Sequence, residues 1–218
     1  MKTVLIAGNV DFLPPEDISP MTEGVEIVVV RDTPEGEINR KVAAAWRDDG
    51  DPWANLLTGL QIDPSSEVAV VAYGRGDGLA DLAAVSGKVG FIATVNMVPS
   101  EGSMPGLADY AKKAREDQAK LLMVTSPENA EAVRAFARSY GEMMCGDLTC
   151  TAGGLGVFTS SLDDRKNVQA SVEAAKTYLG DVTEPEVASK PGKKSNTGAI
   201  ATIAILAAGA GLLLIGGD

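Results

Sequence analysis

The chain has 218 residues, 45% of them hydrophobic and 22% charged, with a formal net charge of −11. This composition is typical of a globular domain with a short appendage, and the acidic balance argues against binding to nucleic-acid phosphates. Histidine is absent. Its absence excludes Ser–His and Cys–His nucleophile pairs, histidine-ligated zinc, and a haem or corrinoid held by histidine of this chain.

Short apolar runs rich in branched side chains predict strands. The first, residues 2–7, is too short for the hydrophobic core of a signal peptide, so we expect a strand and a domain that stays in the cytoplasm. Runs that are apolar almost throughout are typical of strands buried on both faces of a parallel sheet. Further strands are expected at residues 25–30, 67–73, 89–95 and 120–125, with a sixth at 154–159.

Segments with helical periodicity alternate with these strands. Ile38, Val42, Ala45 and Trp46 have the spacing of one buried helix face, and Pro52 is suited to the first position of the next helix. The dipeptide Ser126–Pro127 indicates another helix start, Ser161 or Asp163 caps the last helix, and one face of that helix carries Val168, Val172, Ala175 and Leu179. The expected helices are 37–48, 52–60, 79–85, 107–118, 128–144 and 161–179.

The regular alternation of strand and helix predicts the fold class. Residues 1–180 are expected to form a doubly wound, Rossmann-like three-layer α/β sandwich, with a mostly parallel sheet of five or six strands. Residues 181–196 contain Pro185 and Pro191 and lose apolar periodicity, which predicts a flexible linker.

Residues 197–215 (TGAIATIAILAAGAGLLLI) contain no charged side chain. As a helix this segment would be roughly 28 Å long, close to the thickness of a bilayer core, so it predicts one transmembrane helix. A buried core helix is the alternative. Lys190, Lys193 and Lys194 precede the segment, so the positive-inside rule predicts a cell-membrane protein with its N-terminal domain in the cytoplasm.

Small side chains recur along this segment at spacings of three and four residues: Ala201, Ala204, Ala208 and Gly211. A helix face of this kind lets helices approach closely in lipid. We therefore expect self-association or packing against other transmembrane subunits, although small residues are also simply tolerated in an anchor.

In open α/β sheets, ligands bind beyond the carboxyl ends of the strands. The polar and glycine residues that this rule makes candidate ligand-binding residues are Asn9, Asp11, Gly74, Arg75, Gly76, Asp77, Gly78, Asn96, Ser126 and Ser160. Residues 74–78 (GRGDG) form the most suggestive group, because a glycine-rich turn before a helix can present N–H groups to an anion. The spacing differs from the dinucleotide-binding pattern, however, and Asp77 is unfavourable near phosphate, so a tight turn is the simpler interpretation.

Cys145 and Cys150 are the only thiols. Their spacing fits no common metal site within one chain. Buried thiols, a redox pair, and ligation of a metal or cluster together with another chain remain the alternatives.

No catalytic constellation is present, which favours a binding or scaffold subunit of an integral membrane complex. The alternative is a membrane-tethered cofactor carrier or transferase with a small-molecule ligand at the strand ends. In layout alone, an α/β domain followed by one C-terminal helix resembles the corrinoid-carrying subunit of the methanogen tetrahydromethanopterin methyltransferase. The missing histidine departs from that pattern, so no ligand residues are transferred and the cofactor is left unassigned.

Overall fold

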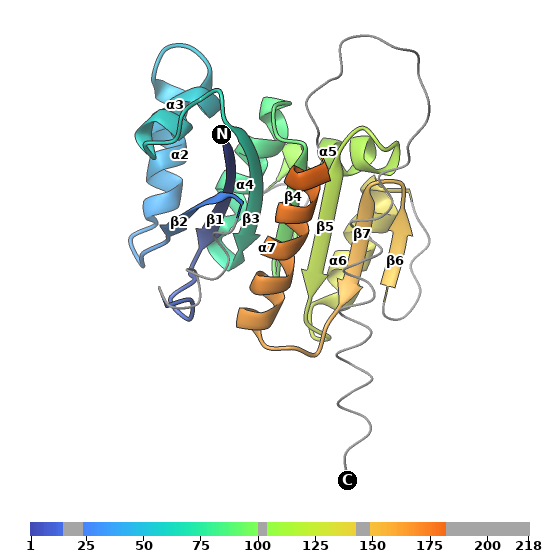
Figure 1. Ribbon diagram of the computed structural model, residues 1–218. Helices are drawn as coiled ribbons and strands as arrows, with labels where there is room; N and C mark the ends of the chain where they lie inside the picture. Colours follow the sequence, from blue (N-terminus) through green and yellow to red (C-terminus); the bar gives the residue numbers. More distant parts are fainter. Residues whose placement is uncertain (15–23, 100–103, 143–148, 182–218) are drawn as a thin grey trace.

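The computed structural model describes residues 1–14, 24–99, 104–142 and 149–181. They form a mixed α/β fold around a seven-stranded sheet in the order β2-β1-β3-β4-β5-β7-β6, parallel except for the β6–β7 pair (Figure 1). The strands are β1 (Lys2–Gly8), β2 (Glu26–Arg31), β3 (Glu67–Tyr73), β4 (Phe91–Val95), β5 (Lys120–Thr125), β6 (Thr149–Ala152) and β7 (Leu155–Thr159).

Helices cover both faces of the sheet. On one face lie α2 (Glu37–Arg47), α3 (Pro52–Gly59), α4 (Asp77–Ser86), α5 (Pro105–Arg115) and α6 (Ala130–Tyr140). The single turn of 3₁₀ helix η2 (Gly74–Gly76) leads into α4, and α7 (Asp164–Asp181) packs on the opposite face. In Figure 1, α7 crosses in front of the sheet. The mixed α/β class and the mostly parallel sheet confirm the prediction at that level.

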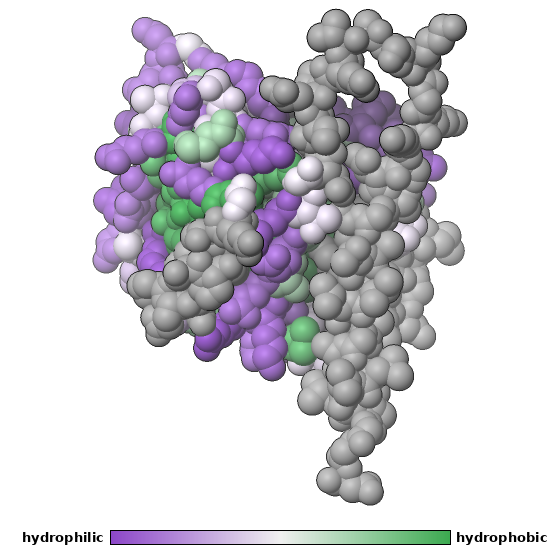
Figure 2. Space-filling view, viewed as in Figure 1, coloured by the Kyte–Doolittle hydropathy of each residue, from purple (hydrophilic) through white to green (hydrophobic). Residues whose placement is uncertain are grey.

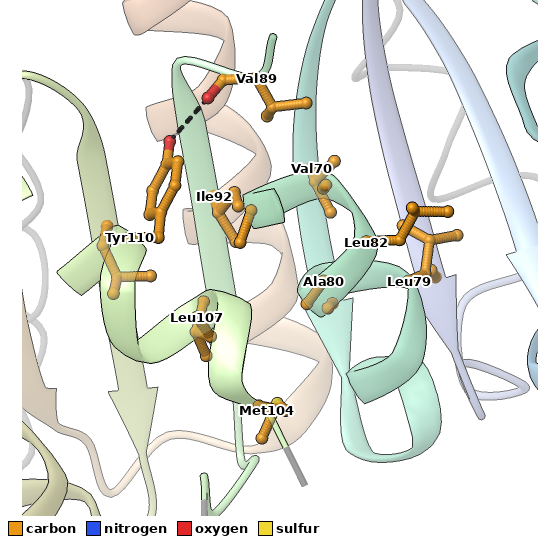
Figure 3. Close-up of a cluster of buried hydrophobic side chains, with 14 of the residues drawn as sticks. Val70, Leu79, Ala80, Leu82, Val89, Ile92, Met104, Leu107 and Tyr110 are labelled. Carbon is orange, nitrogen blue, oxygen red and sulfur yellow. Dashed lines mark hydrogen bonds between the residues drawn. The ribbon is translucent and has the colours of Figure 1, made fainter. Parts of the chain in front are cut away.

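Side chains alternate between two cores because successive residues of a strand point to opposite faces. The larger core joins Leu5, Val70 and Ile92 to the five-helix layer. Figure 3 shows its centre between β4, α4 and α5, where the hydroxyl of Tyr110 donates a hydrogen bond to the Val89 carbonyl at 3.0 Å. The smaller core joins alternate residues of the same strands to α7, whose predicted face is fully buried: Val168, Val172, Ala175 and Leu179.

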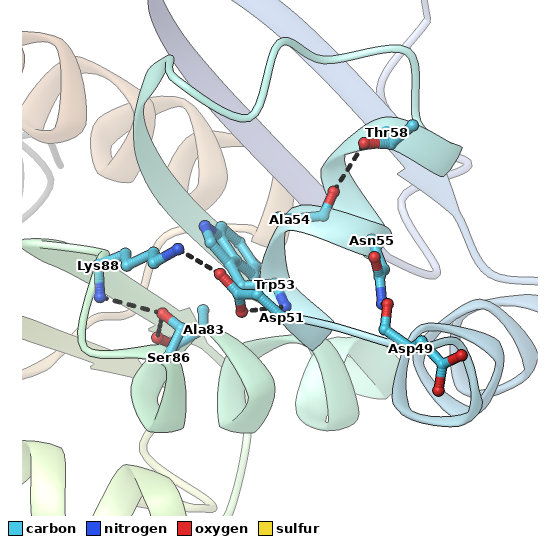
Figure 4. Close-up of polar contacts among 9 residues, drawn as sticks. All are labelled: Asp49, Asp51, Trp53, Ala54, Asn55, Thr58, Ala83, Ser86 and Lys88. Atoms are coloured by element: carbon cyan, nitrogen blue, oxygen red, sulfur yellow. Dashed lines mark hydrogen bonds and ion pairs between the residues drawn. The ribbon is translucent and has the colours of Figure 1, made fainter.

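The start of α3 follows the sequence prediction closely. Pro52 is its first residue, and the Asp51 side chain accepts a hydrogen bond from the Trp53 backbone nitrogen at 3.0 Å. Asp51 also pairs with Lys88, which follows α4, so this cap ties two helices together (Figure 4).

Sequence expectations differ from the structure at several points. The short strand β6 was not predicted, because four residues carry too little periodicity to register. Helix α6 begins at Ala130 rather than at residue 128, because residues 127–129 form a turn. Trp46 was placed on the buried face of α2 but is 54% exposed, whereas Trp53 is buried.

The linker expected from residue 181 and the transmembrane helix expected at 197–215 fall outside the described residues, apart from Asp181 at the end of α7. Within the described ranges, each helix is too short or too polar to span a bilayer.

Candidate functional site

A cleft of about 570 Å³ lies at the carboxyl ends of β3, β4, β5 and β7. Its walls come from the segment that precedes α6 and from the connection between β7 and α7. The lining residues are Tyr73, Asn96, Ser126, Pro127, Glu128, Asn129, Ser160, Ser161, Leu162, Asp163 and Asp164. Because strands, turns and the first residue of α7 meet there, residues distant in sequence form one polar surface.

The carboxylate of Asp164, the first residue of α7, organises this surface. The Tyr73 hydroxyl at the end of β3 donates to one of its oxygens, and the Asn96 side-chain amide after β4 donates to the other. The carbonyl oxygen of the same Asn96 side chain accepts a hydrogen bond from the Ser126 backbone nitrogen at 2.6 Å. These bonds link the ends of β3, β4 and β5 to the start of α7.

Asn96 makes these bonds from an uncommon backbone conformation, with φ of 48°. Asparagine tolerates the left-handed region better than most residues with a side chain. Ser160 closes the neighbouring wall: its backbone nitrogen donates to the Thr125 carbonyl at 2.8 Å, and its hydroxyl accepts from the Leu162 nitrogen at 3.1 Å. The floor of the cleft is therefore fixed by hydrogen bonds from three strands.

The cleft is acidic. Three carboxylates line it, from Glu128, Asp163 and Asp164, and its described lining contains neither lysine nor arginine. The Asp163 carboxylate accepts a hydrogen bond from the Lys166 backbone nitrogen at 2.8 Å, which caps α7, and its other oxygen lies 3.8 Å from the Lys166 ammonium group. The starts of α6 and α7 offset part of the negative charge through their dipoles. The remaining excess favours a ligand group that is positively charged or rich in hydrogen-bond donors.

The environment of the cleft shifts the pKa of the Tyr73 hydroxyl. Partial burial, followed by its hydrogen bond to Asp164 and the charge of that carboxylate, raises the pKa of Tyr73 to about 12. The Phe12 ring packs edge-on against the tyrosine ring, with centroids 5.0 Å apart. At neutral pH the hydroxyl is thus a fixed donor rather than a base.

We expect Tyr73→Phe to remove one tyrosine that ionises near pH 12 in a titration followed at 295 nm. The direction of the pH dependence follows from linkage. Because the pKa of Tyr73 is higher in the folded state, its protonated hydroxyl stabilises the fold fully below pH 10, and this stabilisation is lost as the pH rises through about 12. The free energy of unfolding of the native chain should therefore fall more steeply over this range than that of the variant. Equal slopes would contradict the Tyr73–Asp164 hydrogen bond. The other tyrosines are present in both proteins, so their contributions cancel when the two pH dependences are compared.

The ten candidate ligand-binding residues predicted from the sequence lie in several separate parts of the structure. Asn96, Ser126 and Ser160 line the cleft together. Asp11 lies apart from them, with its carboxylate 3.9 Å from the guanidinium of Arg31. Asp77 and Gly78 form the first turn of α4, where Gly78 faces the side chain of Asn39.

A second group meets between β1 and β3, where the strand order reverses and where a ligand crevice is usual. Here the Asn9 side chain accepts a hydrogen bond from the Arg75 nitrogen at 3.3 Å and lies against Gly74. A Cβ on Gly76 would lie 2.5 Å from the Ala7 carbonyl oxygen. The glycine-rich turn is therefore packed closely against β1.

Sequence reasoning missed Tyr73, Glu128 and Asp164 as site residues, and it noted Asp163 only as a helix cap. The sequence could have indicated Tyr73, because it is the last residue of a predicted strand and ligand sites lie at strand ends. Its contact with Asp164 spans 91 positions of sequence. No local pattern indicates a pairing of that separation.

The two thiols stay unassigned. Cys150 lies in β6, opposite Val157 of β7, whereas Cys145 lies outside the described residues. Across the described ranges, no cluster of cysteine, aspartate and glutamate side chains is arranged to hold a metal ion. Comparison with protein-family models, with curated proteins and with solved structures finds no match for this chain.

Proposed function

We propose that this chain is a binding subunit of an integral membrane complex, anchored by residues 197–215, with its α/β domain on the cytoplasmic side. The domain would be doubly wound and Rossmann-like. The partner presents a basic or hydroxyl-rich group to the cleft. The observation that carries this choice is the excess of carboxylates over basic groups in a cleft of about 570 Å³.

The strand–turn–helix after β3 supports binding over hydrolysis. Hydrolases of α/β architecture place a nucleophile between two glycines at such a turn. Here the middle position of Gly74-Arg75-Gly76-Asp77-Gly78 is glycine, and the Ala7 carbonyl leaves no room for a side chain on it. Asp164, the best-placed carboxylate of the cleft, already accepts hydrogen bonds at both oxygens. It is suited to holding the cleft in shape and to adding negative charge.

The membrane part of the proposal rests on composition. The segment 197–215 is uncharged and follows three lysines, which favours insertion with the domain inside the cell. Its small-residue face, formed by Ala201, Ala204, Ala208 and Gly211, suits close packing against another helix. The domain and the anchor would then contact the same complex at two places.

Fractionation of cells tests the anchor directly. The full chain is expected in the pelleted membranes and to resist alkaline carbonate washing, whereas a chain ending at residue 196 should stay in the supernatant. Recovery of the full chain in the supernatant would overturn the membrane assignment.

Co-purification from mild detergent tests the cleft. We expect the double variant Glu128→Gln, Asp163→Asn to lose its companions, because the variant removes two of the three negative charges that line the cleft. Glu116→Gln changes an exposed acid outside the cleft lining and serves as the control. Retention of the same companions by the double variant contradicts a role for the cleft. A bound chromophore in the ultraviolet–visible spectrum would instead favour the tethered cofactor carrier or transferase.

A further inference from the structure

Strand β2 forms one edge of the described sheet, and the backbone groups on its outer side point away from β1. Asp32, directly after β2, donates its backbone N–H to the Gly8 carbonyl at 2.8 Å. In a parallel ladder alternate residues face the neighbouring strand, so Val28 and Val30 also direct their groups to β1. Ile27, Val29 and Arg31 therefore point theirs outward, where no described residue bonds to them.

The side chains of this edge are unusually apolar for a free strand. Residues 25–31 read VEIVVVR, and Ile27, Val28 and Val29 are only partly buried. Figure 2 shows hydrophobic residues at the surface over the β1–β2 side of the molecule. On the other face, a groove of about 390 Å³ follows the edge, lined by residues 28–31, Glu37, Lys41 and 59–61. Natural sheets usually protect such an edge with charge, proline, or a covering helix or loop.

We propose that β2 pairs with β2 of a second copy of this chain, in antiparallel fashion about a two-fold axis at Val28. Antiparallel pairing requires that outward-facing residues meet one another. This condition excludes a centre between two residues, and of the registers centred on a residue, those at Val28 and Val29 keep most of β2 paired. With the axis at Val28, Ile27 of each copy exchanges hydrogen bonds with Val29 of the other.

Charge distinguishes these two registers. When the two-fold axis lies at Val29, Glu26 of one copy lies opposite Asp32 of the other, which brings two negative charges together. When the axis lies at Val28, Glu26 lies opposite Val30, which lines the groove together with Lys41. Glu26 is exposed, and its side chain points to the same face as Val28 and Val30. Its carboxylate, which accepts a hydrogen bond from the Thr3 hydroxyl at 3.3 Å within its own chain, then reaches the groove of the second copy, where Lys41 pairs with Glu37 at 3.4 Å and Arg31 adds a further positive charge. The reciprocal contact follows from the symmetry.

Val29→Pro tests this interface in the full chain, purified in mild detergent. Proline removes an outward N–H and leaves the bonds between β2 and β1 intact. We expect sedimentation equilibrium to show a dimer for the native chain and a dissociation constant raised by about tenfold or more for the variant, because two symmetric hydrogen bonds are lost. Val29→Thr keeps both the N–H and the branched side chain and should remain dimeric.

Amide exchange separates this interface from association through the anchor. As the protein concentration rises, the amides of Ile27, Val29 and Arg31 should become protected, whereas those of Val28 and Val30 stay unchanged. A monomer at all concentrations overturns the proposal. So does a dimer in which these three amides exchange freely, since it would assemble elsewhere. Protection seen only when other subunits are present assigns the edge to a different partner and also overturns it.

Discussion

Gly8→Ala is expected to destabilise the fold by about 3 kcal/mol or more, because a methyl group at the end of β1 has no space to occupy. A Cβ on Gly8 would lie 2.0 Å from the Tyr73 carbonyl oxygen, and the residue has φ of +141°, which side chains rarely adopt. The contact is with backbone of the adjacent strand β3, so relief requires β1 and β3 to separate. Urea unfolding followed by the fluorescence of the buried Trp53 measures the loss.

Gly87→Ala is the matched control for this substitution. Gly87 also has a positive φ, +67°, but a Cβ there would meet no atom within 4 Å. Its replacement isolates the backbone penalty, roughly 1–2 kcal/mol. If Gly8→Ala lowers the free energy of unfolding no more than Gly87→Ala does, β1 and β3 do not approach each other as closely as described. Tyr73 lies at this contact, so the Gly8 variant should also lower the pH at which Tyr73 ionises.

Phe91→Ala is expected to cost about 3–5 kcal/mol, the range for emptying a buried aromatic site. Phe91 begins β4, is 1% exposed and belongs to the core beneath α7. Its ring centroid is 5.5 Å from that of Tyr178 on α7. Loss of the ring removes both the sheet-side packing and this aromatic contact.

Phe91→Leu preserves most of the volume and should cost less than about 1.5 kcal/mol. Hydrogen exchange adds a spatial readout: Phe91→Ala should increase exchange along α7 more than along α5, because α5 packs on the opposite face. A uniform increase through both helices would mean that α7 is not a separate layer held by this core.

Patterns of apolar residues predicted most of the scaffold. Six strands and six helices were expected within a few residues of their positions, since each is long enough to display its period. The exceptions have local causes. Strand β6 is held by its antiparallel pairing with β7 rather than by its own pattern, and Trp46 shows that helical spacing alone does not determine which residues at a face margin are covered.

The site was only partly predictable. Strand ends identified Asn96, Ser126 and Ser160, because their position depends on topology alone. The same rule also selected Asn9 and Arg75, which instead bond to each other through the Asn9 side chain and the Arg75 backbone nitrogen. The close packing of Gly76 against Ala7 of β1 appears only in three dimensions, so the sequence did not distinguish the two places. Asp164 became central because α7 returns over β3 and β4, a path that sequence periodicity does not specify.

Helix α7 also sets the direction from which a partner arrives. It starts at the cleft and continues for 18 residues, about 27 Å, before the chain proceeds past Asp181. Cleft and exit thus occupy opposite poles of the domain. A partner bound in the cleft therefore contacts the end of the domain opposite Asp181.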